Sequence, residues 1–130
     1  MTHYFTREEA EKLLPEISVI LENIQAAHRG IGESENELEA LRLQAMGNGH
    51  HLHERITQAQ KNLATNIQQL QIQYAQLEEY GCELKDPSIG LIDFLSERDG
   101  REIYLCWHLG ETGINFWHYP EAGFAGRQPL

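Results

Sequence analysis

The feature that most constrains this chain is an apolar repeat of seven residues between residues 51 and 80. A heptad spacing keeps its members on one side of a helix, and it is typical of a coiled-coil-like seam. Gly81 follows the repeat, where a glycine commonly ends a helix. We therefore expect a helix of about 30 residues, or roughly 45 Å, whose seam residues are Ile56, Leu63, Leu70 and Leu77, with Ile67 and Tyr74 beside them.

A second run of helical spacing precedes this repeat; it begins at Leu13, is interrupted at Gly30-Ile31-Gly32, and resumes with Leu38, Leu41 and Ala45. Thr6 and Glu9 form a capping box, since each side chain can satisfy the backbone amide of the other residue. Pro15 lies inside the run, so we expect a kink there. The stretch Gly47-Asn48-Gly49 predicts a reversal, because both residue types adopt positive φ readily. Residues 1–82 are thus expected to form a long antiparallel helical hairpin.

The pattern changes to period two from Ile89 onward. Asp99-Gly100 predicts a tight hairpin turn in which Arg98 lies opposite Arg101. A third strand, from Ile114 to Tyr119, is expected to return after the Gly110–Gly113 loop. We therefore predict a single α+β domain over residues 1–130, with a three-stranded antiparallel sheet and an anchored C-terminal tail in residues 83–130. The more apolar face, expected to cover the helices, holds Ile92, Phe94, Ile103, Leu105 and Trp107.

Composition excludes several classes of function. The formal net charge is −10, with 10 Lys and Arg against 20 Asp and Glu. Nucleic acids and anionic membranes both require clustered basic residues, so neither is an expected partner. No apolar run approaches the length of a membrane span, and the N-terminus does not resemble a signal peptide. We expect a cytoplasmic protein in which Cys82 and Cys106 are free thiols.

Three stretches carry a family resemblance: GLIDF, DGREIYLCWHLGE and FWHYPEAGFAGRQPL. They resemble the C-terminal signature of the Domain of Unknown Function 2203 family of bacterial and archaeal proteins, and the helical part of the chain also fits. The resemblance implies no biochemical role, because none is established for the family. His108 and the histidines near the helical turn lie outside the family pattern, whose matching positions are Asp93, Trp107, Glu111, Trp117, His118, Gly126 and Arg127.

Asp93, Glu111 and His118 are the candidate metal ligands. Two carboxylates and an imidazole are a common ligand set for zinc, iron or manganese, with positions left for water or substrate. Their proximity depends on the register of the third strand. If His118 pairs with Tyr104 it shares a face with Asp93, whereas if it pairs with Leu105 it faces away. The sequence leaves both registers open, and the alternative is a purely structural role for these residues.

Arg127, Trp107 and Trp117 are the candidate ligand-binding residues. The planar guanidinium of Arg127 suits a carboxylate, either from a ligand or from Asp93 or Glu111 in an internal salt bridge. The two tryptophans could stack on a ligand, although large aromatic residues in a small sheet usually belong to the core. Phe124 is expected to anchor the tail in an apolar groove, on this chain or on a neighbour.

Two other groupings are weaker. The stretch GHHLH places His50, His51 and His53 close together, as in some metal sites, but the signal is weak and a solvated interhelical turn is the simpler interpretation. Cys106 and His108 could form a nucleophile and its base, but residues two apart on a strand are about 7 Å apart. A buried, unreactive thiol is the alternative for Cys106.

Two classes of function follow from these patterns. The favoured class is a module that self-associates, as a homodimer through the helical hairpin, or that binds another protein. The alternative is a small metal-dependent enzyme, such as a hydrolase, with its site on the C-terminal sheet. In that enzyme a bound metal would activate water and Arg127 would hold an anionic substrate.

Overall fold

A computed structural model describes residues 2–48 and 50–130 of the chain. Two compact units make up the structure. The sheet unit comprises Met1–Glu22 and Ala75–Leu130, and the hairpin unit comprises Asn23–Tyr74. Gly49, on which part of the expected reversal falls, lies outside the described residues.

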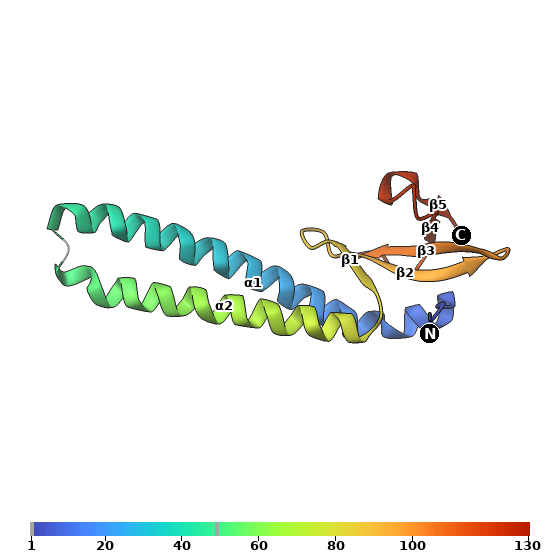
Figure 1. The fold of residues 1–130 in the computed structure, drawn as a ribbon, viewed down its shortest axis with the longest axis horizontal. Helices are drawn as coiled ribbons and strands as arrows, with labels where there is room; N and C mark the ends of the chain where they lie inside the picture. Colours follow the sequence, from blue (N-terminus) through green and yellow to red (C-terminus); the bar gives the residue numbers. More distant parts are fainter. Residues whose placement is uncertain (1, 49) are drawn as a thin grey trace. The chain divides into compact units, whose positions relative to one another are not determined.

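Two helices form the first two-thirds of the chain (Figure 1). Helix α1 spans Arg7–Asn48 and includes Pro15, and α2 spans His53–Glu79 after a short 3₁₀ turn, η1, at His50–Leu52. The capping box is confirmed: the amide of Glu9 donates to Thr6 Oγ1 at 3.1 Å, and the amide of Thr6 donates to Glu9 Oε1 at 3.2 Å. The expected helical hairpin is therefore present.

Within the hairpin unit the heptad repeat packs against α1. Leu38 and Leu41 of α1 form a buried cluster with Leu52 of η1 and Ala59 of α2, and partly buried Leu63 packs against that cluster. Ile67, expected in the seam, is 41% exposed, whereas Asn66 is half-buried. The expected place of Ile67 is wrong because the seam continues three residues after Leu63 rather than four. The buried and half-buried residues of the seam are Leu52 in η1, followed on α2 by Ile56, Ala59, Leu63, Asn66, Leu70 and Gln73.

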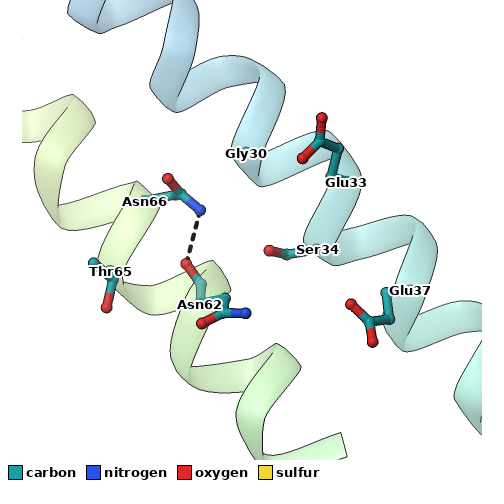
Figure 2. Close-up of a pocket in the computed structure, with 7 residues that line it drawn as sticks. All are labelled: Gly30, Glu33, Ser34, Glu37, Asn62, Thr65 and Asn66. Atoms are coloured by element: carbon teal, nitrogen blue, oxygen red, sulfur yellow. Dashed lines mark hydrogen bonds between the residues drawn. The ribbon is translucent and has the colours of Figure 1, made fainter. Parts of the chain in front are cut away.

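A polar groove interrupts this seam, with a volume of about 260 Å³ (Figure 2). A Cβ atom at Gly30 would lie 2.6 Å from the side chain of Asn66, so a side chain at position 30 would displace the Asn66 amide from its place in the seam. Asn66 also donates to the carbonyl of Asn62 at 2.9 Å. The glycines at 30 and 32 therefore do not end the helix; Gly30 makes room for a polar contact.

The sheet has five antiparallel strands in the order β1-β2-β3-β4-β5. They are β1 Glu83–Asp86, β2 Leu91–Arg98, β3 Arg101–His108, β4 Phe116–His118 and β5 Gln128–Pro129. The prediction of three strands is wrong, because it missed the two edge strands, β1 and β5. Strand β1 is short and polar, and β5 has two residues, one of them a proline, so neither shows an apolar alternation.

The central hairpin agrees with the sequence analysis. Asp99 and Gly100 have φ values of 52° and 76°, as their turn requires. Arg98 lies opposite Arg101, and the register continues to Leu91 opposite His108. The apolar face is buried, and Phe5 joins it through a ring contact with Phe94 at 5.1 Å. The backbone amide of Phe5 donates to Leu95 O at 2.8 Å, which ties the N-terminal segment to the sheet.

The C-terminal tail docks on its own chain. Phe116 lies opposite Pro129, and the amide of Leu130 donates to Asn115 O at 2.8 Å. A short 3₁₀ helix, η2 (Phe124–Gly126), precedes β5. Phe124 is 44% exposed, so it is not buried in a groove of its own chain. Strand pairing by β5 holds the tail instead.

Among the residues that the structure describes, no helix is long and apolar enough to cross a membrane.

Candidate functional site

Three polar side chains from three strands meet on the sheet face opposite Phe94. Asp93 of β2 lies opposite Cys106 of β3, and His118 of β4 lies opposite Tyr104. Of the two registers left open, β4 therefore takes the one that puts His118 on the face of Asp93. Asp93, Cys106 and His118 are 3%, 1% and 2% exposed, and a potential ligand atom from each lies within 4.8 Å of the other two.

The hydrogen bonds of His118 define its tautomer. Its Nδ1 lies 2.8 Å from Tyr119 O, and its Nε2 lies 3.0 Å from Asp93 Oδ2. A carbonyl oxygen only accepts, so we assign the Nδ1 proton to the bond with Tyr119. Nε2 and Oδ2 therefore face each other and share a single proton when no metal is bound. Asp93 Oδ1 is buried and has no hydrogen-bond partner among the described residues.

Burial dominates the titration of this cluster. It raises the pKa of Asp93, while the hydrogen bond and charge of His118 act in the opposite direction. Burial, with the nearby Asp93 carboxylate, also raises the pKa of Cys106 to about 11, although Arg127 opposes this rise. The thiol of Cys106 is thus protonated at neutral pH in the metal-free protein. That state does not suit a nucleophile, which must be a thiolate.

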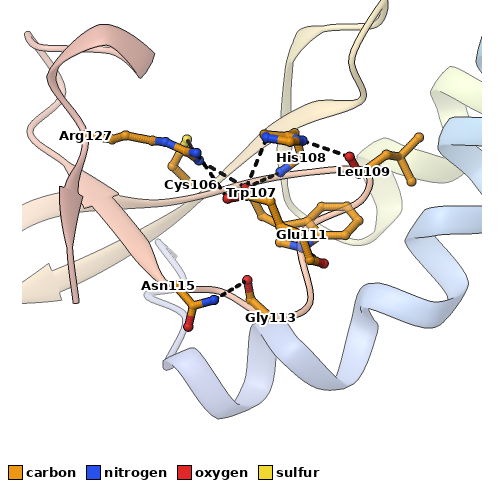
Figure 3. A network of polar contacts seen from close by, with 8 residues as sticks. All are labelled: Cys106, Trp107, His108, Leu109, Glu111, Gly113, Asn115 and Arg127. Carbon is orange, nitrogen blue, oxygen red and sulfur yellow. Dashed lines mark hydrogen bonds and ion pairs between the residues drawn. The ribbon is translucent and has the colours of Figure 1, made fainter.

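Arg127 and Glu111 form a second polar network beside the cluster (Figure 3). Arg127 Nη1 and Nη2 donate to Glu111 Oε1 and Oε2 at 3.0 and 3.1 Å. The guanidinium carbon lies 4.0 Å from the ring centre of Phe116 and 4.6 Å from that of Phe124. Arg127 Nη1 is also 3.9 Å from Cys106 Sγ. The fork is therefore held in place and already occupied by a carboxylate of its own chain.

The structure separates the three residues expected to bind metal. Asp93 and His118 meet, but Glu111 binds Arg127 and accepts a hydrogen bond from the amide of His108 at 3.0 Å. Cys106 occupies the third position of the cluster instead. The period-two pattern already predicted that Cys106 lies on the same face as Asp93. It did not predict that His118 joins both, because the sequence left the register of β4 open.

The other candidate residues lie elsewhere. Trp107 and Trp117 are 3% and 5% exposed on the opposite, core-facing side of the sheet, and Trp107 Nε1 donates to Glu111 O at 3.1 Å. His108 directs Nδ1 to Leu109 O at 2.8 Å, and its Nε2 lies 3.7 Å from Glu111 Oε1 rather than at the thiol of Cys106.

Within the stretch GHHLH, His51 and His53 are exposed, and the side chain of His50 lies outside the described residues. The described part of this stretch therefore assembles no metal cluster of the kind seen on the sheet.

Fold and site together define a small α+β protein: a helical hairpin, a five-stranded antiparallel sheet and a buried Asp-Cys-His cluster. The chain belongs to the Domain of Unknown Function 2203 (DUF2203) family of uncharacterized conserved proteins, whose sequence profile matches residues 3–130. Comparison with curated proteins gives no match, and comparison with solved structures gives none either.

Proposed function

We propose that this protein binds one divalent transition metal ion through Asp93, Cys106 and His118, and that zinc is the preferred ion. The observation that carries the proposal is a buried carboxylate oxygen, Asp93 Oδ1, that has no hydrogen-bond partner among the described residues, while Oδ2 of the same group lies 3.0 Å from His118 Nε2. Buried polar atoms normally have partners. A metal ion would satisfy these atoms together.

The orientation of His118 fits a metal ligand. Histidines that bind metals usually donate the other ring N–H to a carbonyl or carboxylate, as Nδ1 of His118 does toward Tyr119. Tetrahedral zinc with bonds of about 2.0 Å separates N and O ligands by about 3.3 Å. The Nε2–Oδ2 distance of 3.0 Å is close to that separation. A metal ion would thus replace the proton between these two atoms with little movement of either side chain.

The charges also balance. Ionised Asp93 and Cys106 would together neutralise a divalent ion, while His118 stays neutral. A buried site of zero net charge avoids the large cost of an uncompensated charge. Because thiolate is a soft ligand, replacing Glu111 by Cys106 in the ligand set favours zinc or iron over manganese.

A catalytic role for this site would make the protein a metal-dependent enzyme. Three protein ligands are typical of catalytic zinc sites, in which water takes the fourth position. Arg127 lies beside Cys106, with Nη1 3.9 Å from Sγ, and would offer a positive charge next to the metal. A catalytic role predicts hydrolysis of ester or phosphoester substrates that depends on added zinc and disappears in the Cys106→Ser variant.

The test is metal content after equilibrium dialysis of reduced, tag-free protein against zinc or cobalt. We expect about one ion per chain, a thiolate-to-cobalt charge-transfer band, and release of protons on binding because Cys106 must ionise. Cys106→Ser should lose the ion and the band with little change in shape. His118→Gln should also lose the ion.

His108→Gln is the matched control, because His108 makes the same Nδ1 contact with the following carbonyl and lies outside the cluster. It should retain the ion. Wild-type protein that takes up no metal, or a Cys106→Ser variant that binds as tightly as the wild type, would refute the proposal. Circular dichroism of each variant separates loss of ligand from loss of fold.

A further inference from the structure

One long surface of α2 is almost free of charge. Residues 56–77 contain a single charged side chain, Lys61, although 23% of the whole chain is charged. At that frequency this stretch would hold about five charged residues. Glutamine, alanine and isoleucine occupy the positions where a solvated helix usually carries Glu and Lys.

These uncharged residues lie away from the seam with α1. Leu63, Asn66 and Leu70 turn toward α1 and are half-buried, so Ala64, Gln68 and Gln71 lie on the outward side of the helix and are exposed. Ile67 and Ile72 flank them and are 41% and 40% exposed. We call this surface the amide face; it comprises Gln60, Ala64, Ile67, Gln68, Gln71 and Ile72.

The part of the seam around Leu63 packs against α1 within the chain. The amide face has the properties of an interface core. Such cores are depleted in charge relative to the rest of the surface. The remainder of this molecule is strongly acidic, with a net charge of −10. Two copies can therefore approach closely at this face without bringing their acidic residues together.

We propose that two copies of this chain associate through the amide face of α2 in a two-fold symmetric contact. Side-chain amides of glutamine both donate and accept hydrogen bonds, so Gln68 and Gln71 complement the same residues of a second copy. A two-fold contact places the same patch on both sides, which a self-complementary surface satisfies. A basic or acidic partner would find no charge to pair with here except Lys61.

The test is the oligomeric state by sedimentation velocity and light scattering at micromolar concentration. The wild type should be a dimer. The double variant Gln68→Glu/Gln71→Glu places like charges against each other across the two-fold axis and should raise the dimer Kd by about 100-fold or more. Gln68→Lys/Gln71→Lys should do the same. An equimolar mixture of the two variants should recover the dimer, because opposite charges then meet.

The matched control is Asn36→Glu/Gln44→Glu, which makes the same change of charge at exposed positions of α1. It should remain dimeric, and circular dichroism should show equal helix content in all variants. A monomeric wild type, a dimeric Gln68→Glu/Gln71→Glu variant, or a mixture that stays monomeric would each overturn the proposal. Retention of metal by the monomeric variants would show that this result is independent of the proposed site on the sheet.

Discussion

The salt bridge between Arg127 and Glu111 should be a substantial source of stability, and Glu111→Gln tests it. Both ends of the pair are largely buried, with side chains 16% and 13% exposed. The substitution removes a charge that accepts from both guanidinium nitrogens and leaves Arg127 fixed between Phe116 and Phe124. Breaking a fully buried pair costs about 3–5 kcal/mol, and the residual exposure lowers this to roughly 2–3 kcal/mol.

The assay is urea unfolding and thermal unfolding of the metal-free protein. A loss of 2–3 kcal/mol corresponds to a fall in Tm of about 7–11 °C for a chain of this size. Glu121→Gln is a matched control, because Glu121 also pairs with an arginine, Arg101, at 2.6 Å, but the two side chains are 65% and 56% exposed. Its cost should stay below about 0.5 kcal/mol.

A double-mutant cycle with Arg127→Met completes this test. The double variant should cost clearly less than the sum of the two single variants, with a coupling energy of about 2 kcal/mol. If Glu111→Gln and Glu121→Gln cost the same, or if the coupling is near zero, burial does not strengthen this pair and the reasoning fails.

Two further predictions concern the pH dependence and the seam. Burial raises the pKa of Cys82 to about 12 and that of Cys106 to about 11, from 9.0 for an exposed thiol. The stability that each protonated thiol contributes is complete below pH 9 and is lost as the pH rises toward these values. For each thiol, the free energy of unfolding of the metal-free protein should fall by about 1 kcal/mol between pH 8 and pH 10. Urea unfolding should show that loss, and the Cys82→Ala/Cys106→Ala variant should lack it; equal losses in both proteins would contradict the assignment. Leu63→Asp should destabilise the hairpin unit by about 2–4 kcal/mol, measured as loss of the helix signal at 222 nm in circular dichroism during urea unfolding. Gln69→Asp, at an exposed position of α2 outside the amide face, should cost under about 1 kcal/mol. Similar costs for the two variants would mean that Leu63 does not face α1.

Much of the fold was predictable because it depends on neighbours in sequence. The capping box at Thr6 and the turn at Asp99-Gly100 follow from local backbone and side-chain requirements, and both are present. The turn then defines every pair between β2 and β3, because a two-residue loop fixes the register of a hairpin. The sequence alone therefore predicted that Asp93 and Cys106 lie on the same face of the sheet.

The edge strands could not be predicted in this way. Strands β1 and β5 pair through backbone groups with partners already formed, so their side chains need no apolar alternation. Which residues of α2 face α1 could not be predicted either. Asn66 rather than Ile67 lies in the seam. The Asn66 amide occupies space that a side chain at position 30 of the facing helix would fill, and position 30 is distant in sequence.

The sequence by itself determined the helical hairpin, the central β-hairpin and the two residues Asp93 and Cys106 on one face. Only the tertiary structure decided that His118 joins them while Glu111 turns to Arg127. The physical reason is that the loop before β4 is irregular, so its length does not specify a register. A shift by one residue would send His118 to the opposite face of the sheet. The pairing of His118 with Tyr104 thus depends on packing of the whole sheet unit, including the tail strand β5.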